Sequence, residues 1–363
     1  MGFSCGIVGL PNVGKSTLFN AMTGAGVAAD NYPFCTIDPN VGVAVVPDSR
    51  LDQIVEIARP QRAVPAVVEF TDIAGLVAGA SQGEGLGNQF LHHIREIDAI
   101  AHVVRCFEDP NVTHVAGTID PIADIQTIDT ELGLADLETV ERAIAKAQRR
   151  ARAGEKEAQA SVTIFERVHA HLAAGHPVRS MELASSEGIA VRDLFLLTAK
   201  PLMYVANVGD DQLHDNPWVA RVAEYAEAER AGVVALTGAL EAELAQLDPT
   251  DRDAMLAEYG LDEPGLETVI HAAYRLVGLE TFFTAMETEA RAWTVRRGTK
   301  APAAAGQIHT DFERGFVRAE VIPYEDYVAA HGEQGAKEAG AMRVEGRDYV
   351  VQEGDVIRFR FNV

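Results

Sequence analysis

The stretch Gly9-Leu10-Pro11-Asn12-Val13-Gly14-Lys15-Ser16 decides the fold, because it matches the phosphate-binding pattern G-x-x-x-x-G-K-[ST]. A short apolar run, 3–8, precedes this loop, and a helix-like segment follows it. Backbone N–H groups and the helix N-terminus of such a loop surround phosphates with positive partial charge. We expect Lys15 to reach the β- and γ-phosphates and the Ser16 hydroxyl to bind magnesium. The expected nucleotide-binding residues of the loop are Asn12, Val13, Gly14, Lys15, Ser16 and Thr17.

A second pattern, D-x-x-G at 72–75, ends another apolar run about sixty residues later in the chain. We expect Asp72 to hold the magnesium ion indirectly, through a water molecule, and Gly75 to let the backbone approach the γ-phosphate. Thr36 lies in the polar, proline-containing segment 31–36 between the two motifs, and it is expected to give the metal a second hydroxyl.

Thr36, Gly75 and Leu76 are therefore predicted to form a switch that the γ-phosphate orders. The glycine-rich segment 79–87 follows them and is predicted to be part of the same switch. We exclude a dinucleotide fingerprint for this segment, because no strand precedes it.

Short apolar runs alternate with helix-like segments through the first part of the chain. This alternation predicts an α/β fold, a Ras-like doubly wound parallel sheet. The expected strands are 3–8, 66–70, 100–107, 202–208 and 233–236.

Two stretches with a single apolar stripe at helical spacing interrupt the alternation. The stripes consist of Leu137, Val140, Ile144, Ala147 and Ala151, and of Val162, Phe165, Val168 and Leu172. Glycines separate and end them, so we expect an antiparallel helical hairpin, 128–197, inserted in the nucleotide-binding domain, 1–277.

The last part of the chain, 278–363, has a different pattern of apolar residues. Runs typical of strands occur at 320–322, 349–351 and 356–361, with little helix expected between them. These runs predict a compact β-rich C-terminal domain.

Composition excludes several classes of protein. Asp and Glu number 54 against 31 Lys and Arg, a net charge of −23, which argues against a protein that coats nucleic acid by bulk attraction. Apolar residues make up 47% and charged residues 23%, which excludes a disordered chain. Three scattered cysteines predict no disulfide framework and no disulfide-linked partner. Without a long apolar run or a signal-peptide pattern, we expect no membrane association and a cytoplasmic protein.

The motifs together resemble the Obg class of P-loop GTPases and, more closely, the Obg-like ATPases of the YchF family. The resemblance rests on the segments 9–18, 31–37, 72–77, 85–91, 99–107 and 349–357, and it covers essentially the whole chain. It implies a Ras-like nucleotide domain that carries an inserted helical hairpin, followed by a C-terminal TGS domain.

The base-reading segment is ambiguous. GTPases use N-K-x-D after a strand, and the aspartate accepts hydrogen bonds from guanine. Here the segment reads Asn207-Val208-Gly209-Asp210, so Asp210 keeps GTP open on chemical grounds. The family resemblance implies ATP, with Asn207 and main-chain groups near Val208 at the base. Asp210 departs from the glutamate that is usual in that family.

Leu76 stands where Ras-type enzymes carry the glutamine that orients water, so we expect slow intrinsic hydrolysis. Two residues are candidates to assist hydrolysis in place of that glutamine. Asn12 resembles the asparagine that helps related P-loop GTPases bind a potassium ion. His114 lies in a loop after a strand and is expected to reach the site when that loop closes.

The resulting hypothesis is a magnesium-dependent ATPase that acts as a ribosome-associated regulatory switch. The alternatives are an Obg-class GTPase and a nucleotide-gated protein-binding module with incidental hydrolysis. Acid-free basic runs at 142–152 and 291–300 lie outside the nucleotide core, and they suit contact with the phosphates of ribosomal RNA. A protein partner that packs on the helical hairpin is the rival expectation.

Overall fold

The computed structural model describes residues 3–24, 40–73, 86–114, 117–210, 212–213 and 215–362. It divides into two compact units, residues 1–43 with 69–273, and residues 44–68 with 274–363. The segment 44–68 lies within the nucleotide-binding stretch of the sequence, yet it packs with the C-terminal residues. Strand β3 (Ala63–Val64) explains this grouping, because it pairs in parallel with β9 (Ala290–Arg296).

The first unit is built on a six-stranded sheet with the order β2-β4-β1-β5-β6-β7. Its strands are β1 (Ser4–Val8), β2 (Val41–Val45), β4 (Val67–Asp72), β5 (Ala99–Cys106), β6 (Leu202–Val208) and β7 (Gly232–Leu236). The pairings of β1 with β4 and β5, of β5 with β6, and of β6 with β7 are parallel. Strands β5 and β6 are buried at every position, as strands covered on both faces must be. The predicted α/β fold is confirmed.

Helices cover both faces of this sheet. Leu18 of α1 (Lys15–Gly24) and Leu266 of α10 (Gly265–Leu276) meet Ile7 of β1 around a small internal cavity. On the opposite face, Tyr204 of β6 packs its ring edge against Tyr225 of α7 (Pro217–Ala228). The unit also contains α3 (Leu86–Glu96), α6 (Ser185–Arg192), α8 (Gly238–Leu244), α9 (Pro249–Tyr259) and the short 3-10 helices η2 (Val178–Ser180) and η3 (Leu197–Ala199).

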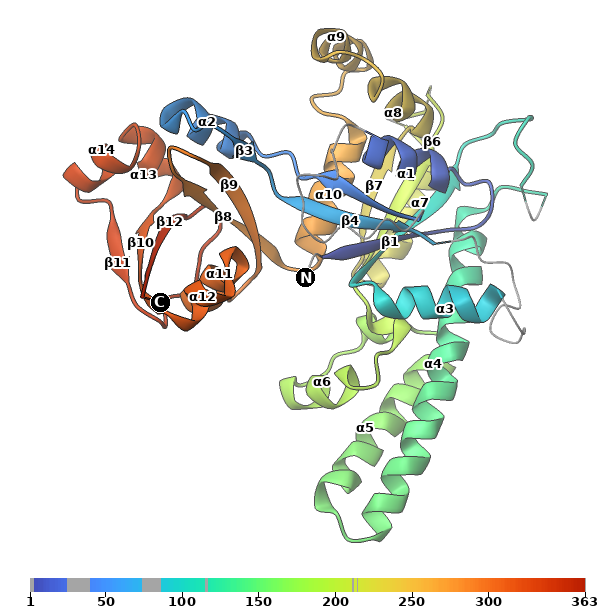
Figure 1. Ribbon diagram of the computed structural model, residues 1–363. Coiled ribbons are helices and arrows are strands. Elements are labelled where there is room, and N and C mark those ends of the chain that lie inside the picture. Colours follow the sequence, from blue (N-terminus) through green and yellow to red (C-terminus); the bar gives the residue numbers. More distant parts are fainter. Residues whose placement is uncertain are drawn as a thin grey trace. The chain divides into compact units, whose positions relative to one another are not determined.

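The predicted helical hairpin is present and consists of α4 (Pro121–Arg152) and α5 (Lys156–Ala173), which extend away from the sheet (Figure 1). Asp120 is the N-cap residue directly before α4, and its carboxylate accepts a hydrogen bond from the Ile122 N–H. The two apolar stripes face each other in a common core that includes Val140, Val162 and Val168. No helix in the described part of the chain is long and apolar enough to cross a membrane.

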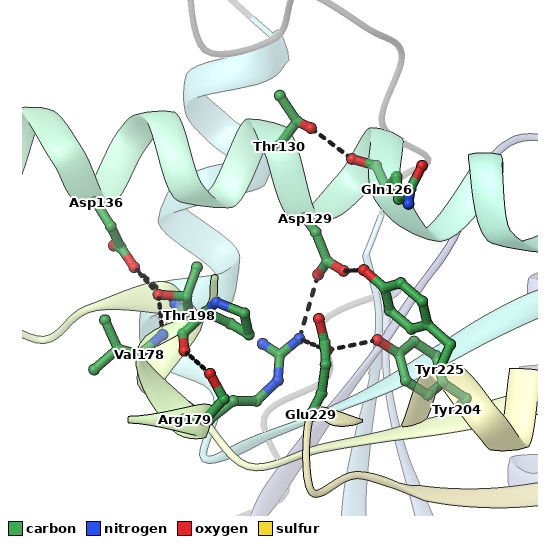
Figure 2. Close-up of polar contacts among 12 residues, drawn as sticks. Gln126, Asp129, Thr130, Asp136, Val178, Arg179, Thr198, Tyr204, Tyr225 and Glu229 are labelled. Carbon is green, nitrogen blue, oxygen red and sulfur yellow. Dashed lines mark hydrogen bonds and ion pairs between the residues drawn. The ribbon is translucent and has the colours of Figure 1, made fainter. Parts of the chain in front are cut away.

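A buried cluster of charged and polar side chains fixes the base of the hairpin (Figure 2). The Arg179 guanidinium lies 2.5 Å from Glu229 and 3.3 Å from Asp129 of α4. Tyr204 donates a hydrogen bond to Glu229, and Tyr225 donates one to Asp129. We call these five residues the hairpin-base cluster. It ties α4 to the sheet through β6 and α7, as Figure 2 shows.

A second sheet, with the order β11-β10-β12-β8-β9-β3, forms the other unit. Its remaining strands are β8 (Leu279–Ala285), β10 (Phe316–Ile322), β11 (Arg343–Glu345) and β12 (Val356–Phe361). Phe282, Phe316 and Phe359 from three of these strands meet in one core. The β-rich C-terminal domain is thus confirmed.

Two details predicted for this domain are wrong. Four short helices interrupt the strands, α11 (Ala301–Ile308), α12 (Thr310–Arg314), α13 (Tyr324–Ala329) and α14 (Glu333–Glu338), and α2 (Ser49–Ala58) joins the unit from the N-terminal half. The run 349–351 forms one isolated bridge, between Val350 and Lys300, and no strand. The Asp355 carboxylate explains the difference, because it accepts hydrogen bonds from the Tyr349 hydroxyl and the Gln352 N–H and so folds this run into a loop.

Candidate nucleotide-binding site

The phosphate loop connects β1 to α1 and has the backbone shape that its glycines permit. Gly14 has φ +100°, and a Cβ there would lie 2.3 Å from Nδ2 of Asn207. Asn12 also has a positive φ, +63°, a conformation that asparagine adopts more readily than most residues. The loop therefore needs glycine at position 14, both for its backbone conformation and for its contact with the end of β6.

Lys15 begins α1 and turns back into the loop. Its Nζ donates a hydrogen bond to the carbonyl of Leu10 at 2.9 Å, and the residue is buried. Burial lowers the pKa of Lys15, and the negative charge of Asp72 opposes that shift. A buried cation that points into a loop of backbone N–H groups is suited to hold phosphate oxygens.

Ser16 and Asp72, the two predicted magnesium residues in the described part of the chain, lie together. The Ser16 hydroxyl donates to Oδ2 of Asp72 at 3.1 Å, although 56 positions separate them in the sequence. The other carboxylate oxygen, Oδ1, is buried and has no hydrogen-bond partner among the described residues. Hydroxyl and carboxylate oxygens are the ligands that magnesium prefers. The pair therefore fits a magnesium site.

Asn207, at the end of β6, joins the phosphate loop to the loop after β7. Its Nδ2 donates to the carbonyl of Val13 at 2.9 Å, and its Oδ1 accepts from the Gly238 N–H at 2.9 Å. Val208 is buried and Asp210 is exposed. Gly238 begins α8 directly after β7, and the sequence patterns did not mark it. The only signal for it was its place after a predicted strand of the parallel sheet.

The loop after β5 lies against the phosphate loop. Asn12 donates through Nδ2 to the carbonyl of Thr113 at 3.1 Å, which brings the two predicted catalytic residues, Asn12 and His114, into adjacent segments. His114 itself is buried, and its Nε2 lies 2.9 Å from Oδ2 of Asp124 on α4. No sequence pattern singled out Asp124. Arg105 of β5, which donates hydrogen bonds to carbonyls of this loop, was also not predicted to have a role there.

Thr17 is exposed on the first turn of α1. Thr36, Gly75 and Leu76, the predicted switch residues, lie outside the described residues.

Comparisons with known proteins agree with this arrangement. The sequence profile described as 50S ribosome-binding GTPase matches residues 4–154. The profile of the YchF-GTPase C-terminal family, described as a protein of unknown function, matches residues 279–362.

Two curated relatives match over their full lengths and over all of this chain. Both are named ribosome-binding ATPase YchF, from Escherichia coli O157:H7 with 56% identity and from Bacillus subtilis strain 168 with 53% identity. The solved structure of the Schizosaccharomyces pombe YchF GTPase superposes with a TM-score of 0.90 at 36% identity and covers 99% of this chain and 98% of that one. Full-length identity at this level, on a shared fold and with an intact phosphate loop, shows that the chain belongs to the YchF ribosome-binding ATPase family.

Proposed function

We propose that this protein binds ATP with magnesium, hydrolyses it slowly to ADP, and acts in the cytoplasm as a ribosome-associated switch. The pairing of Ser16 with Asp72 carries the proposal, because it places a hydroxyl and an unsatisfied carboxylate oxygen beside a phosphate loop. The curated relatives are named as ribosome-binding ATPases, which supports the same activity and partner.

Magnesium would be held by Ser16 and Asp72, and by Thr36 from the switch segment. When bound, it neutralises negative charge on the phosphates. Lys15 adds a second positive charge at the phosphates, and the N–H groups of the loop fix their position. Asp72→Asn should abolish the effect of magnesium on ATP affinity, measured by titration with a fluorescent ATP analogue with and without chelator. Equal magnesium dependence in the variant and the wild type would refute this assignment.

Hydrolysis needs a group that positions water, because Leu76 cannot do so. His114 is our candidate for that role, and Asn12 is the candidate ligand of a potassium ion. Single-turnover measurements test both. His114→Ala should slow hydrolysis without weakening ATP binding, and potassium should accelerate the wild type more than sodium does. If the wild type and His114→Ala hydrolyse ATP equally fast, the role of His114 is refuted.

The proposal also includes the choice of base, adenine rather than guanine. The curated relatives are named ATPases, whereas the fission yeast relative is titled a GTPase. Val208 is buried at the end of β6, which leaves its main-chain groups to meet the base, and the exposed Asp210 could serve guanine. Competition between ATP and GTP for one fluorescent nucleotide decides the question. Tighter binding of GTP would replace the ATPase assignment with an Obg-class GTPase.

The ribosome-binding surface is proposed at the tip of the hairpin. Arg142, Lys146, Arg149, Arg150 and Arg152 are all exposed there. Arg150 pairs with Glu155 at 2.6 Å, but solvent screens this exposed pair, so a phosphate can replace the carboxylate. In the second basic run, 291–300, two of the cations already form ion pairs, Arg297 with Glu280 and Lys300 with Asp348.

Glutamate substitutions at Arg149, Arg150 and Arg152 should abolish co-sedimentation with ribosomes in the ATP state and leave ATP affinity unchanged. Lysine at the same three positions is the matched control, because it keeps the charge and should keep the binding. Added salt should weaken the wild-type interaction. Full binding by the glutamate variant would remove the hairpin tip from the interface. If the wild type also fails to co-sediment, a protein partner becomes the better proposal.

A further inference from the structure

His114 is held by a carboxylate that the catalytic hypothesis did not include. Its Nε2 lies 2.9 Å from Oδ2 of Asp124, and each of the two side chains is only 6% exposed. Asp124 belongs to the first turn of α4, four residues after the N-cap Asp120. A histidine on an exposed surface loop would have no such fixed partner.

The loop that carries His114 is itself fixed by a buried guanidinium. Arg105 of β5 is 1% exposed and donates to three carbonyls of this loop, those of Phe107 at 3.1 Å, Val112 at 2.9 Å and Asp109 at 3.4 Å. Its guanidinium also lies 4.6 Å from the ring centroid of Phe107. The loop backbone thus wraps a buried cation, and its path is set before it reaches His114.

The same loop touches the phosphate loop one residue earlier. The carbonyl of Thr113 accepts the hydrogen bond from Asn12. His114 is therefore anchored on one side to α4, through Asp124, and on the other to the phosphate loop, through its neighbour Thr113.

From this arrangement we propose that Asp124 is a positioning residue for His114, which it holds in one ring orientation and one tautomer for hydrolysis. The inference rests on the proposed role of His114 in ATP hydrolysis. An ionised Asp124 can only accept a hydrogen bond, so the proton of the neutral ring lies on Nε2 and Nδ1 is the acceptor nitrogen. When His114 takes a proton, the same carboxylate stabilises the positive ring.

Asp124 has the environment that this role requires. Burial raises its pKa, but the hydrogen bond from His114 and the positive charge of Arg105 oppose the shift. The first turn of a helix also favours a negative charge. An oriented histidine backed by a buried carboxylate is a recurrent arrangement for proton transfer and for water positioning.

The tautomer of His114 can be measured without any turnover. In protein labelled with nitrogen-15 in its histidine rings, two-bond correlation spectra report which ring nitrogen carries the proton, and His114→Gln identifies the signal. We expect the Nε2–H form in the wild type and a mixture of tautomers in Asp124→Ala. Asp120→Asn is the matched control, because it removes a nearby carboxylate, keeps the helix cap and should leave the tautomer unchanged. The same tautomer in the wild type and Asp124→Ala would overturn the proposal.

A double-mutant cycle separates positioning from plain support of the fold. Asp124→Asn keeps the shape and loses the charge, and we expect it to lower the single-turnover rate at least tenfold with ATP affinity unchanged. In a His114→Ala background the same substitution should have no further effect on the rate. Equal slowing in both backgrounds would show that Asp124 acts elsewhere and would overturn the proposal.

The two experiments also separate this inference from the proposed function. If His114→Ala hydrolyses ATP as fast as the wild type, the catalytic role of His114 fails, and the positioning role of Asp124 in hydrolysis fails with it. The tautomer measurement would still report whether Asp124 fixes the ring. If the tautomer is fixed and His114→Ala is slow, but Asp124→Asn is as fast as the wild type, only the positioning proposal fails.

Discussion

Replacing Arg179 with methionine should destabilise the protein strongly, because the hairpin-base cluster then keeps two buried carboxylates and loses its cation. The Arg179 side chain is 8% exposed, and those of Asp129 and Glu229 are 14% and 10% exposed. Burial opposes the charge on Arg179, but the two carboxylates raise its pKa above the ordinary value, so it is charged at every accessible pH. Breaking a buried ion pair from one side costs about 3–5 kcal/mol.

This cost should depend on pH in a direction that the cluster determines. Burial raises the pKa of Asp129 to about 6 even with Arg179 present. For a carboxyl group with a raised pKa, the folded state binds more protons than the unfolded state between the unfolded and the folded pKa values. Stability therefore falls as pH rises through that window. Without Arg179 the window extends further upward, so lowering the pH from 8 to 5.5 should recover part of the loss.

Urea denaturation of Arg179→Met and the wild type at pH 8 and pH 5.5 measures both effects. In a separate thermal melt at pH 8 the melting temperature should fall by about 6–20 °C, at about 2–4 °C per kcal/mol for a domain of this size. Arg167→Met is the matched control, because Arg167 of hairpin helix α5 forms its ion pair with Glu187 of α6 near the surface, where solvent screens the charges, and its loss should leave the free energy of unfolding nearly unchanged. A loss below about 1 kcal/mol for Arg179→Met at pH 8, or a loss that pH does not change, would refute the reasoning.

Three further predictions follow from the site and the core. Gly14→Ala should reduce ATP affinity at least tenfold in a nucleotide titration, because the positive φ costs about 1–2 kcal/mol and the new Cβ would meet the Asn207 side chain. Asn207→Ala breaks two hydrogen bonds that join the phosphate loop to the loop after β7, so it should cost about 1–3 kcal/mol in thermal unfolding and weaken nucleotide binding, whereas unchanged values would contradict its role. Burial raises the pKa of Cys5 and Cys106 to about 12, so neither thiol should react with a thiol reagent at pH 8 until urea unfolds the protein.

The sequence alone was sufficient to predict the fold of the nucleotide-binding core and the presence of the hairpin. The phosphate loop is a local motif whose glycines and lysine imply its shape, and D-x-x-G at a strand end implies a neighbouring position in a parallel sheet. Ser16 and Asp72 therefore could be placed together although they are far apart in the chain. The hairpin was equally predictable, because a single apolar stripe on each of two helices must be buried against something.

What the sequence could not supply are contacts between segments that show no local pattern. Asp124 lies on a helix face like any other polar residue, and only the folded chain brings it to His114. The partners of Arg179 lie about 50 residues away on either side, on α4 and directly after α7, so no spacing rule relates them.

The packing of 44–68 with the C-terminal strands and the loop at 349–351 have the same origin. Local periodicity reports which side of an element is apolar. It does not report which distant strand pairs with that element, or which carboxylate accepts hydrogen bonds from it. Strand β3 pairs with the distant strand β9, and the run 349–351 forms a loop because Asp355 accepts the hydrogen bond from the Gln352 N–H. Motif and periodicity thus determined the class of site and the kind of element, whereas long-range pairing and buried charge in the tertiary structure decided how His114 is held and how the hairpin is anchored.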